Sequence, residues 1–392
     1  MSPYPGELSV PARVLLGPGP SEVHPRVLRA QSAPLVGHLD PFFLDLVNQV
    51  KDLLRWVFET ENRMTFPVSG TGTAGMESCF ANLLEHGDRI LVCVNGYFGT
   101  RMCDIAVRCG AEVTRIDQEW GKAFEPSAIA NALKDNAFKV VSIVHAETST
   151  GVLQPLEEIS RLVHDAGSML LVDTVTSLGG CPVEIDKQNI DATYSGSQKC
   201  LSAPPGISPV SFSEMAMDCI RRRKTAVQSF YLDMTLIDKY YGSGRAYHHT
   251  APISSVYGFY EALRLAHEEG LQRRFERHQR NHRALVAGLE AMGLSMHVDA
   301  SERLWMLNTV QVPEEIDDAD LRTQLLTEYG IEIGGGLGDL KGKVMRIGLM
   351  GHSSNRRNVT LLLSALSVLL NQRGIKADAD TALAAAGEAF ES

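Results

Sequence analysis

The stretch PLEEISRLVHDAGSMLLVDT, residues 155–174, places a helical segment directly before an apolar strand that ends in a carboxylate. Residues 155–166 have the mixed polar and apolar pattern of an amphipathic helix, and MLLVD (169–173) reads as a buried strand. Further candidate strands, mostly separated by helical segments, lie at 89–94, 112–116, 140–145, 192–195 and 209–213. This alternation predicts βα units on a mostly parallel sheet, and so an α/β fold.

The pattern changes in the last third of the chain. A single long helix is predicted from 259 to about 292, because buried-type side chains recur there at spacings of three, four or seven. These are Leu271, Phe275, His282, Leu285 and Leu289. The segments that follow predict a small α+β domain with strands at 294–298, 307–312 and 344–348 and helices around 318–329 and 355–371. The Ala-rich last twenty residues form either a loosely packed helix or a frayed tail.

At 392 residues the chain is too long for one compact core, so two domains are expected. We place an N-terminal arm at 1–22, a large domain at 23–265 and a small C-terminal domain at 266–392. The large domain carries the parallel sheet, and the long helix leads from it into the small domain.

The composition argues against several classes of protein. The net charge of -10 and the lack of a large basic block disfavour a nucleic-acid partner. No stretch reaches 18 apolar residues and the N-terminus lacks the pattern of a signal peptide, so neither membrane insertion nor secretion is expected. The seven cysteines include no CxxC pair and read as reduced thiols of a cytosolic protein.

One lysine occupies an unusually confined position. In YSGSQKCLSAPPG (194–206), Lys199 lies between small polar residues and a Pro-Pro-Gly turn. A lysine on a loop is usually a solvated charge, but here small residues let the backbone approach a ligand and the prolines stiffen the exit. A held, partly desolvated amine with a lowered pKa is what Schiff-base chemistry with an aldehyde requires.

A carboxylate is expected in the same crevice. Asp173 ends an apolar strand, and ligands of parallel sheets bind at the carboxyl ends of the strands. On its own the residue could equally cap the next turn. Paired with Lys199, it suggests pyridoxal phosphate, whose pyridine nitrogen needs a carboxylate to stay protonated.

The Gly-rich stretch VSGTGTAGMES (68–78) leads into a predicted helix. Backbone amides there, with the hydroxyls of Thr71 and Thr73, can form an anion site at the start of that helix. The GK[ST] ending of a nucleotide P-loop is absent and the GxGxxG dinucleotide pattern is not met. A single phosphate ester is therefore the ligand that fits better.

Three further stretches place polar or aromatic residues near strand ends. Phe98 in NGYFG (95–99) either stacks on a cofactor ring or belongs to the core. HAETSTG (145–151) brings Glu147, Thr148 and Ser149 to the crevice edge. Arg346 lies on the apolar strand MRIGLMG (345–351), where either a carboxylate ligand or an internal ion pair would offset its burial.

A metal site is not predicted. The adjacent histidines of AYHHTAP (246–252) would point to opposite sides of an extended chain, and no third ligand appears at metal spacing.

Together these stretches resemble the class V aminotransferases of the fold-type I pyridoxal-phosphate enzymes. The resemblance runs from residue 15 to about residue 370, and within the class it is greatest to alanine:glyoxylate and serine:pyruvate aminotransferases. It is carried by the ordered motifs GPGPS, SGTGTAGMES, ETSTGVLQP, VDTVTSLGG, SGSQKCLSAPPG, YHHTAP and GKVMRIGLMG.

The resemblance implies a role for each matching residue. Lys199 would form the internal aldimine with pyridoxal phosphate and then shuttle a proton, while Asp173 would pair with the pyridine nitrogen. Phe98 would stack on the ring, and Thr148 would hydrogen-bond near the ring hydroxyl. The phosphate would be held by Thr71, Gly72, Thr73 and Gln198, joined by Tyr247 and Thr250 of the other subunit. Substrate contacts would come from Arg346, which binds the carboxylate, from Gly19 in a segment that closes over it, and from Thr148.

The activity implied is ping-pong transamination between a small amino acid, alanine or serine, and a small 2-oxo acid, glyoxylate or pyruvate. The resemblance also implies a homodimer with shared active sites, and the C-terminal AFES, which lacks a peroxisomal tripeptide, favours a cytoplasmic location. Two positions depart from the animal alanine:glyoxylate enzymes. Phe98 replaces their tryptophan and Thr73 their histidine, which affects ring stacking and substrate preference.

Two other readings remain open. A lyase, desulfurase or epimerase of the same fold would keep Lys199 and Asp173, although a desulfurase also needs a mobile cysteine and Cys200 lies on a stiff loop. A non-catalytic protein that binds pyridoxal phosphate would typically have lost Lys199 or Arg346, and both are present.

Overall fold

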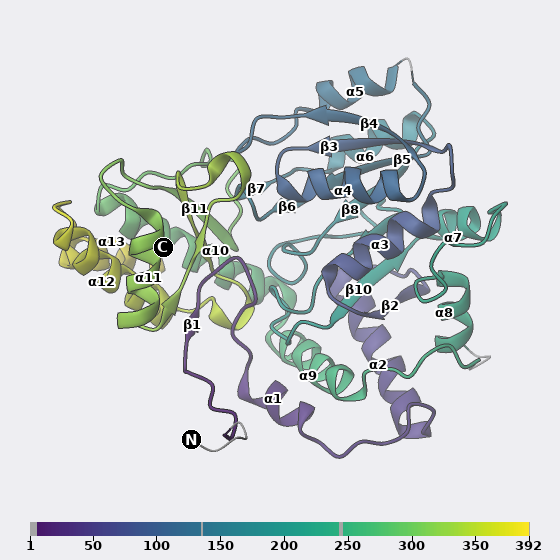
Figure 1. Ribbon diagram of the computed structural model, residues 1–392, viewed down its shortest axis with the longest axis horizontal. Coiled ribbons are helices and arrows are strands. Elements are labelled where there is room, and N and C mark those ends of the chain that lie inside the picture. The colour runs from purple at the N-terminus through teal and green to yellow at the C-terminus, as the bar shows by residue number, and fades with distance from the viewer. Residues whose placement is uncertain (1–5, 135, 243–245, 392) are drawn as a thin grey trace.

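The computed structural model describes residues 6–134, 136–242 and 246–391, so the first five residues of the predicted N-terminal arm lie outside the described part. Its centre is a seven-stranded sheet (Figure 1). In their order across the sheet the strands are β2 (Met64–Ser69), β10 (Ile207–Phe212), β9 (Ala192–Tyr194), β8 (Met169–Asp173), β5 (Val140–Val144), β3 (Arg89–Val94) and β4 (Glu112–Asp117).

The sheet is mostly parallel. Strand β10 runs antiparallel to its two neighbours, β2 and β9, and the other four pairings are parallel. The predicted α/β class is therefore confirmed. The predicted strands at 192–195 and 209–213 correspond to β9 and β10 with ends displaced by one or two residues.

Crossover helices cover both faces of this sheet. They are α3 (Gly72–Leu83), α4 (Tyr97–Arg108), α5 (Pro126–Lys134) and α6 (Glu157–Asp165). Because parallel crossovers are right-handed, the helices that move the chain toward β4 lie on one face and those that return it lie on the other. In Figure 1, α3 and α4 lie in front of the sheet and α6 lies behind it. This arrangement leaves the carboxyl ends of the strands open at one edge.

Six more helices surround the sheet or lead away from it. They are α1 (Pro25–Gln31), α2 (Pro41–Phe58), α7 (Glu214–Arg221), α8 (Met234–Tyr241), α9 (Ile253–Glu269) and α10 (Leu271–Ala291). Local sequence sets several of their starts. In α2, for example, Asp40 accepts a hydrogen bond from the amide of Phe42 at 2.8 Å, and Pro41 occupies the first helical position.

The small domain is built around a second sheet. Its strands, in order, are β11 (Leu307–Gln311), β14 (Val344–Gly348) and β13 (Gly334–Gly335), and its helices are α11 (Asp318–Glu328), α12 (Arg356–Gln372) and α13 (Ala379–Glu391). The N-terminal segment joins this domain, because β1 (Val14–Leu15) pairs with β12 (Ile331–Glu332). Short 3-10 helices, η1 (Gly338–Leu340) and η2 (Gly351–Ser353), flank β14.

The hydrophobic core has two main parts. The larger part fills the space between the seven-stranded sheet and its helices, and the smaller one lies between β11, β14 and the helices α10 to α13. Leu16, near the start of the chain, is fully buried in the smaller part. The domain limits at residues 22 and 265 stay predictions.

The single helix predicted from 259 to 292 is wrong. The chain forms two helices there, α9 and α10, which are separated at Gly270. Gly270 has a φ of +82°, a conformation that glycine adopts readily and that a right-handed helix cannot continue through. The periodic pattern persists across the break, which is why it suggested one helix.

Two other expectations are settled near the C-terminus. The strand predicted at 294–298 is absent, and Met296 makes only an isolated bridge to Val310. The Ala-rich tail is the helix α13, which packs against α10 and buries Ala382 and Ala386. Small side chains suit this close helix contact, since Gly288 of α10 lies against the carbonyl of Ala382.

Among the residues that the structure describes, no helix combines the length and the apolar character needed to cross a membrane.

Close packing of α3 on the sheet yields a stability prediction. A Cβ at Gly75 would collide with Ser208 Oγ and lie 3.0 Å from Tyr194 Cβ, so Gly75→Ala is expected to lower the free energy of unfolding by about 1–3 kcal/mol. Gly387 of α13 has open space around it, and Gly387→Ala should instead raise that free energy by up to about 1 kcal/mol. Urea denaturation measures both, and equal effects at the two positions would contradict the packing described.

Candidate active site

A pocket of about 220 Å³ opens at the carboxyl ends of the central strands. Asp173 ends β8, Lys199 follows β9, and Phe98 follows β3 at the start of α4. Such strand ends are where open parallel sheets bind ligands. The residues that line the pocket are Thr71, Gly72, Thr73, Met76, Phe98, Arg101, Asp173, Val175, Gln198 and Lys199.

Lys199 is enclosed by the N-terminal segment of the chain. Its Nζ donates a hydrogen bond to the carbonyl of Pro18, and the Ser21 hydroxyl donates to the carbonyl of Lys199 at 2.8 Å. Gly19 lies against the same side chain, because a Cβ there would be 2.6 Å from Lys199 Nζ. Lys199 is only 9% exposed, and this burial lowers the pKa of its amine to about 8. The neutral, nucleophilic amine is thus accessible close to physiological pH.

Asp173 is also buried, and its two carboxylate oxygens have separate partners. Oδ1 accepts a hydrogen bond from the amide of Val175 at 2.8 Å, and Oδ2 accepts one from the hydroxyl of Tyr194 at 2.9 Å. Burial raises the pKa of Asp173 to about 7 even though both hydrogen bonds oppose the change. A cation placed beside this carboxyl would favour its ionised form.

The opposite end of the pocket is the start of α3. Thr71 is the N-cap residue, but its side chain makes no capping hydrogen bond. The positive end of the helix dipole and its first amides are therefore available to an anion. Gln198 lies on this pocket wall, and within the described residues its buried Oε1 has no hydrogen-bond partner. An amide that turns its NH₂ toward the pocket would donate to an anion there.

One wall of the pocket is the ring of Phe98, and hydrogen bonds to the first turn of α4 hold it in place. Phe98 lies in the first turn of α4, and its amide donates to Glu147 Oε2 at 3.2 Å, while the amide of Tyr97 donates to Ser149 Oγ at 2.8 Å. These two side chains take the place of a cap residue, because the N-cap position is Gly96. Glu147 and Ser149 thus hold the Phe98 ring at the pocket rather than binding a ligand themselves.

Arg346 approaches the same region from the small domain. Its Nε donates to the carbonyl of Gly335 at 2.7 Å and its Nη1 to the carbonyl of Thr148 at 2.9 Å. Arg346 is buried, and burial lowers its pKa to about 10, so the guanidinium remains charged at neutral pH. Neither partner is a carboxylate, which leaves the positive charge free to pair with an anionic ligand.

Two predicted residues lie elsewhere. Tyr247 is 65% exposed and its ring contacts His38, with 5.6 Å between ring centroids. Thr250 is exposed as well, and neither residue lines the pocket around Lys199. Of the other predicted residues, seven line this pocket, Gly19 lies against Lys199, and Arg346 binds the carbonyl of Thr148.

Two residues of the pocket region were not among those predicted from the sequence. Tyr194 lies directly opposite Asp173 in the parallel pairing of β9 with β8, so its position at the strand end was a usable signal. Arg101 lies one helical turn after Phe98, with its guanidinium 4.9 Å from the centre of that ring and 3.3 Å from Thr73 Oγ1. The spacing of three residues on α4 would have placed it on the same face.

Known proteins are similar to this chain over most of its length. The aminotransferase class-V family profile matches residues 28–357. Alanine–glyoxylate aminotransferase of Callithrix jacchus is 42% identical over 363 residues, which cover 92% of this chain and 88% of that protein.

Two solved structures are similar over nearly the whole chain. That of alanine–glyoxylate aminotransferase from Nostoc sp. has a TM-score of 0.93 and 49% identity, and covers 94% of this chain and 97% of its own. That of ureidoglycine–glyoxylate aminotransferase from Bacillus subtilis has a TM-score of 0.97 and 40% identity, and covers 99% of this chain and 100% of its own.

The burial of Lys199 predicts a distinctive pH dependence. In the cofactor-free protein, acylation of its amine should increase as the pH rises through about 8, because only the neutral amine reacts. Exposed Lys341, labelled in the same sample, is the reference, and mass spectrometry of the peptides quantifies both. Identical pH curves for the two lysines would show that the Lys199 amine is not desolvated as described.

Proposed function

The chain belongs to the class V aminotransferase family, and we propose that it transfers the amino group of alanine or serine to glyoxylate, with pyruvate as a second acceptor. It is an enzyme whose cofactor is pyridoxal phosphate. The names of its relatives, alanine–glyoxylate aminotransferase and (S)-ureidoglycine–glyoxylate transaminase, share glyoxylate, which supports this acceptor. The observation that carries the proposal is the enclosure of the Lys199 amine and the Asp173 carboxyl in one pocket.

The residues present fit pyridoxal phosphate. The start of α3, which no side chain caps, and the side-chain amide of Gln198 on the pocket wall suit its phosphate, supplemented by the hydroxyls of Thr71 and Thr73. The Asp173 carboxyl, held by Val175 and Tyr194, suits its pyridine nitrogen. When bound, the cofactor supplies an aldehyde that exchanges with amines and a ring that withdraws electrons.

Lys199 has two tasks in this proposal. Its amine would hold the cofactor aldehyde, and its Nζ would take a proton from the substrate α-carbon. Both tasks need a neutral amine, which the burial of Lys199 favours. They also need the amine to stay in one place, and contacts with Pro18 and Gly19 restrict its movement.

Arg346 orients the substrate. Its planar guanidinium is held in a fixed position by the carbonyls of Gly335 and Thr148, and a substrate carboxylate would supply its missing counter-charge. This contact also fixes the backbone of Thr148, which we assign to the wall around substrate and cofactor. Phe98 would cover one face of the cofactor ring, with Glu147 and Ser149 holding its helix.

The cysteine next to Lys199 argues against a desulfurase. Cys200 is fully buried, its thiol donates to the carbonyl of Thr176 at 3.3 Å, and burial raises its pKa to about 12. A mobile thiolate is therefore not available at this position.

We propose that the active unit is a homodimer with shared sites. Tyr247 and Thr250 are exposed in one protomer, and their implied task at the phosphate requires another copy to present them. Several large apolar side chains of the same protomer are also exposed, as expected of a surface that becomes covered. They include Leu35, Leu39, Phe42, Phe230 and Tyr231.

A cytoplasmic location completes the proposal. Its support is that all seven cysteines are free thiols, which suits a reducing compartment.

The first test follows the half-reaction. When alanine or serine is added without an oxo acid, the wild-type enzyme should convert the bound cofactor to its amino form, seen as a shift of its near-visible absorbance. Lys199→Ala should lose this conversion by about 10²- to 10⁴-fold, because the proton acceptor is removed. Lys341→Ala, at an exposed lysine, is the control. Release of pyruvate and ammonia from serine would support a lyase instead.

A second test addresses the shared site. Protomers carrying Lys199→Ala are mixed with protomers carrying Tyr247→Ala and Thr250→Ala. Hybrid dimers should regain activity, because one of their sites combines an intact lysine with an intact Tyr247 and Thr250. If hybrids are no more active than the parent homodimers, each site uses residues of one chain.

A further inference from the structure

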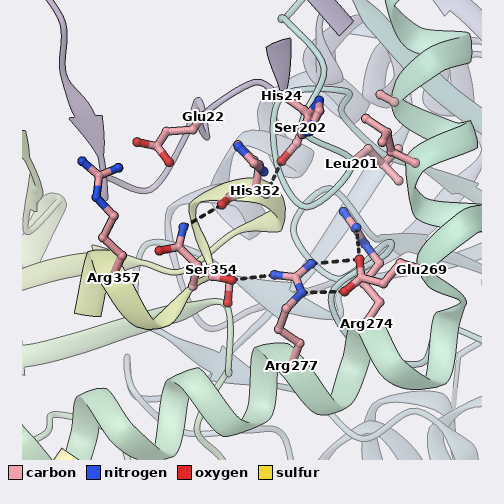
Figure 2. A pocket seen from close by; sticks show the side chains of 13 residues that line it. Glu22, His24, Leu201, Ser202, Glu269, Arg274, Arg277, His352, Ser354 and Arg357 are labelled. Carbon is pink, nitrogen blue, oxygen red and sulfur yellow. Dashed lines mark hydrogen bonds and ion pairs between the residues drawn. The ribbon is translucent and has the colours of Figure 1, made fainter. Parts of the chain in front are cut away.

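The first half of α10 carries a stripe of polar side chains that the proposed chemistry does not use, all buried except Arg277, which is half-buried. They are Arg274, Arg277, His278 and Asn281, which recur at spacings of three and four residues and so share one face of the helix. The first two line a cleft of about 520 Å³, together with residues of the segment after Lys199 and of the turn after β14. Figure 2 shows both arginines beside Glu269 at this cleft. Polar groups buried in this way need specific partners.

Arg274 has three partners, and two of them belong to the active-site loops. Its Nη2 donates to the carbonyl of Cys200, the residue after Lys199, and its Nε donates at 2.8 Å to the carbonyl of Gly179 in the loop that follows Asp173. Its Nη1 donates to Glu269 at 2.7 Å. Arg274 is 5% exposed, so Glu269 offsets a charge that water does not reach.

Arg277 connects the same carboxylate to the small domain. It donates to Glu269 at 2.5 Å through Nε, and its Nη1 donates to the carbonyls of Gly351 and Ser354 at 2.8 and 2.6 Å. His278 Nε2 accepts a hydrogen bond from the amide of Gly351 at 2.9 Å. These contacts fix the turn that follows β14, the strand that carries Arg346.

The donors of both arginines are thus engaged with Glu269 and with loop carbonyls. The cleft beside them therefore receives no free cation from Arg274 or Arg277. Instead, the two arginines bind the segment after Lys199 and the turn after β14 to helix α10.

We propose that Arg274 is a positioning residue for Lys199: it anchors the Cys200 carbonyl, and through Glu269 and Arg277 it ties the lysine loop to the turn after the Arg346 strand. This inference rests on the proposed function, in which Lys199 moves the proton and Arg346 binds the substrate. The planar guanidinium group of arginine can donate to two carbonyls and a carboxylate at the same time. The ammonium group of lysine does not provide this geometry.

The first measurement is the half-reaction with alanine, in the holoenzyme, for Arg274→Gln and Arg274→Lys. Loss of the anchor should lower the maximal rate on the order of 10- to 100-fold, with the KM for alanine little changed. Arg274→Lys, which keeps a charge opposite Glu269, should fall between wild type and Arg274→Gln. Arg274→Lys is included because it keeps the test possible if Arg274→Gln fails to fold.

Arg273 offers a matched control. It is the preceding residue of α10 and is exposed, so Arg273→Gln should leave the rate at the wild-type level. Equal rates for the Arg273 and Arg274 variants would overturn the proposal.

The decisive measurement separates positioning from general damage. In a Lys199→Ala background, methylamine in solution can serve as the proton acceptor, and it is not attached to the lysine loop. If Arg274 acts through Lys199, adding Arg274→Lys to this background should leave the methylamine-supported rate unchanged. A further loss similar to that seen with Lys199 present would overturn the proposal, since it would mean that Arg274 supports the pocket as a whole.

The two proposals fail in different ways. If Lys199→Ala alone retains the wild-type rate, the assignment of the lysine is wrong and the function must be revised. If Lys199→Ala is inactive but the Arg274 variants match Arg273→Gln, only the positioning role is wrong.

Discussion

The hydrogen bond from the Lys199 amine to the carbonyl of Pro18 joins segments 181 residues apart, and much of the site is arranged around it. A buried ammonium group needs an acceptor, and a backbone carbonyl supplies one without adding a competing charge. The segment that provides it is held on the other side by the small domain, where the amide of Gly348 donates to the carbonyl of Leu16 at 2.8 Å. The N-terminal segment that covers the lysine is therefore bound by residues of both domains.

Burial also explains why the charged groups of the site differ from their counterparts in water. Desolvation moves the Lys199 amine and the Asp173 carboxyl toward their neutral forms, with pKa values of about 8 and about 7. For the lysine this change favours nucleophilic and proton-accepting chemistry near neutral pH. For the Asp173 carboxyl the neutral form is favoured only while no cation lies beside it, because a protonated ring nitrogen there would restore the ionised form. Arg346 differs, since its lowered pKa of about 10 still leaves it charged.

Much of this arrangement could be predicted from the sequence, and the failures have physical causes. Strand ends are marked by a change from apolar to small or polar residues, so Asp173 and Lys199 could be assigned to one edge of the sheet. The break at Gly270 was missed because side-chain periodicity records which faces are buried, not whether the backbone is continuous. LSMHV (294–298) was predicted as a strand because its side chains alternate, but its pairing with β11 is limited to one bridge, between Met296 and Val310, with a backbone hydrogen bond on either side.

The polar stripe of α10 was missed for a related reason. Helix α10 serves two environments, because Leu285 and Leu289 in its second half belong to the small-domain core, whereas Arg274 and Arg277 in its first half bind loop carbonyls. From the sequence, arginines near the start of a helix read as a solvated face. Their hydrogen bonds follow only from the loops that converge there, which come from Gly179, Cys200 and Gly351 and lie far apart in the sequence. The break at Gly270 brings Glu269 back toward both arginines, so the glycine that interrupts the helix also completes the ionic cluster.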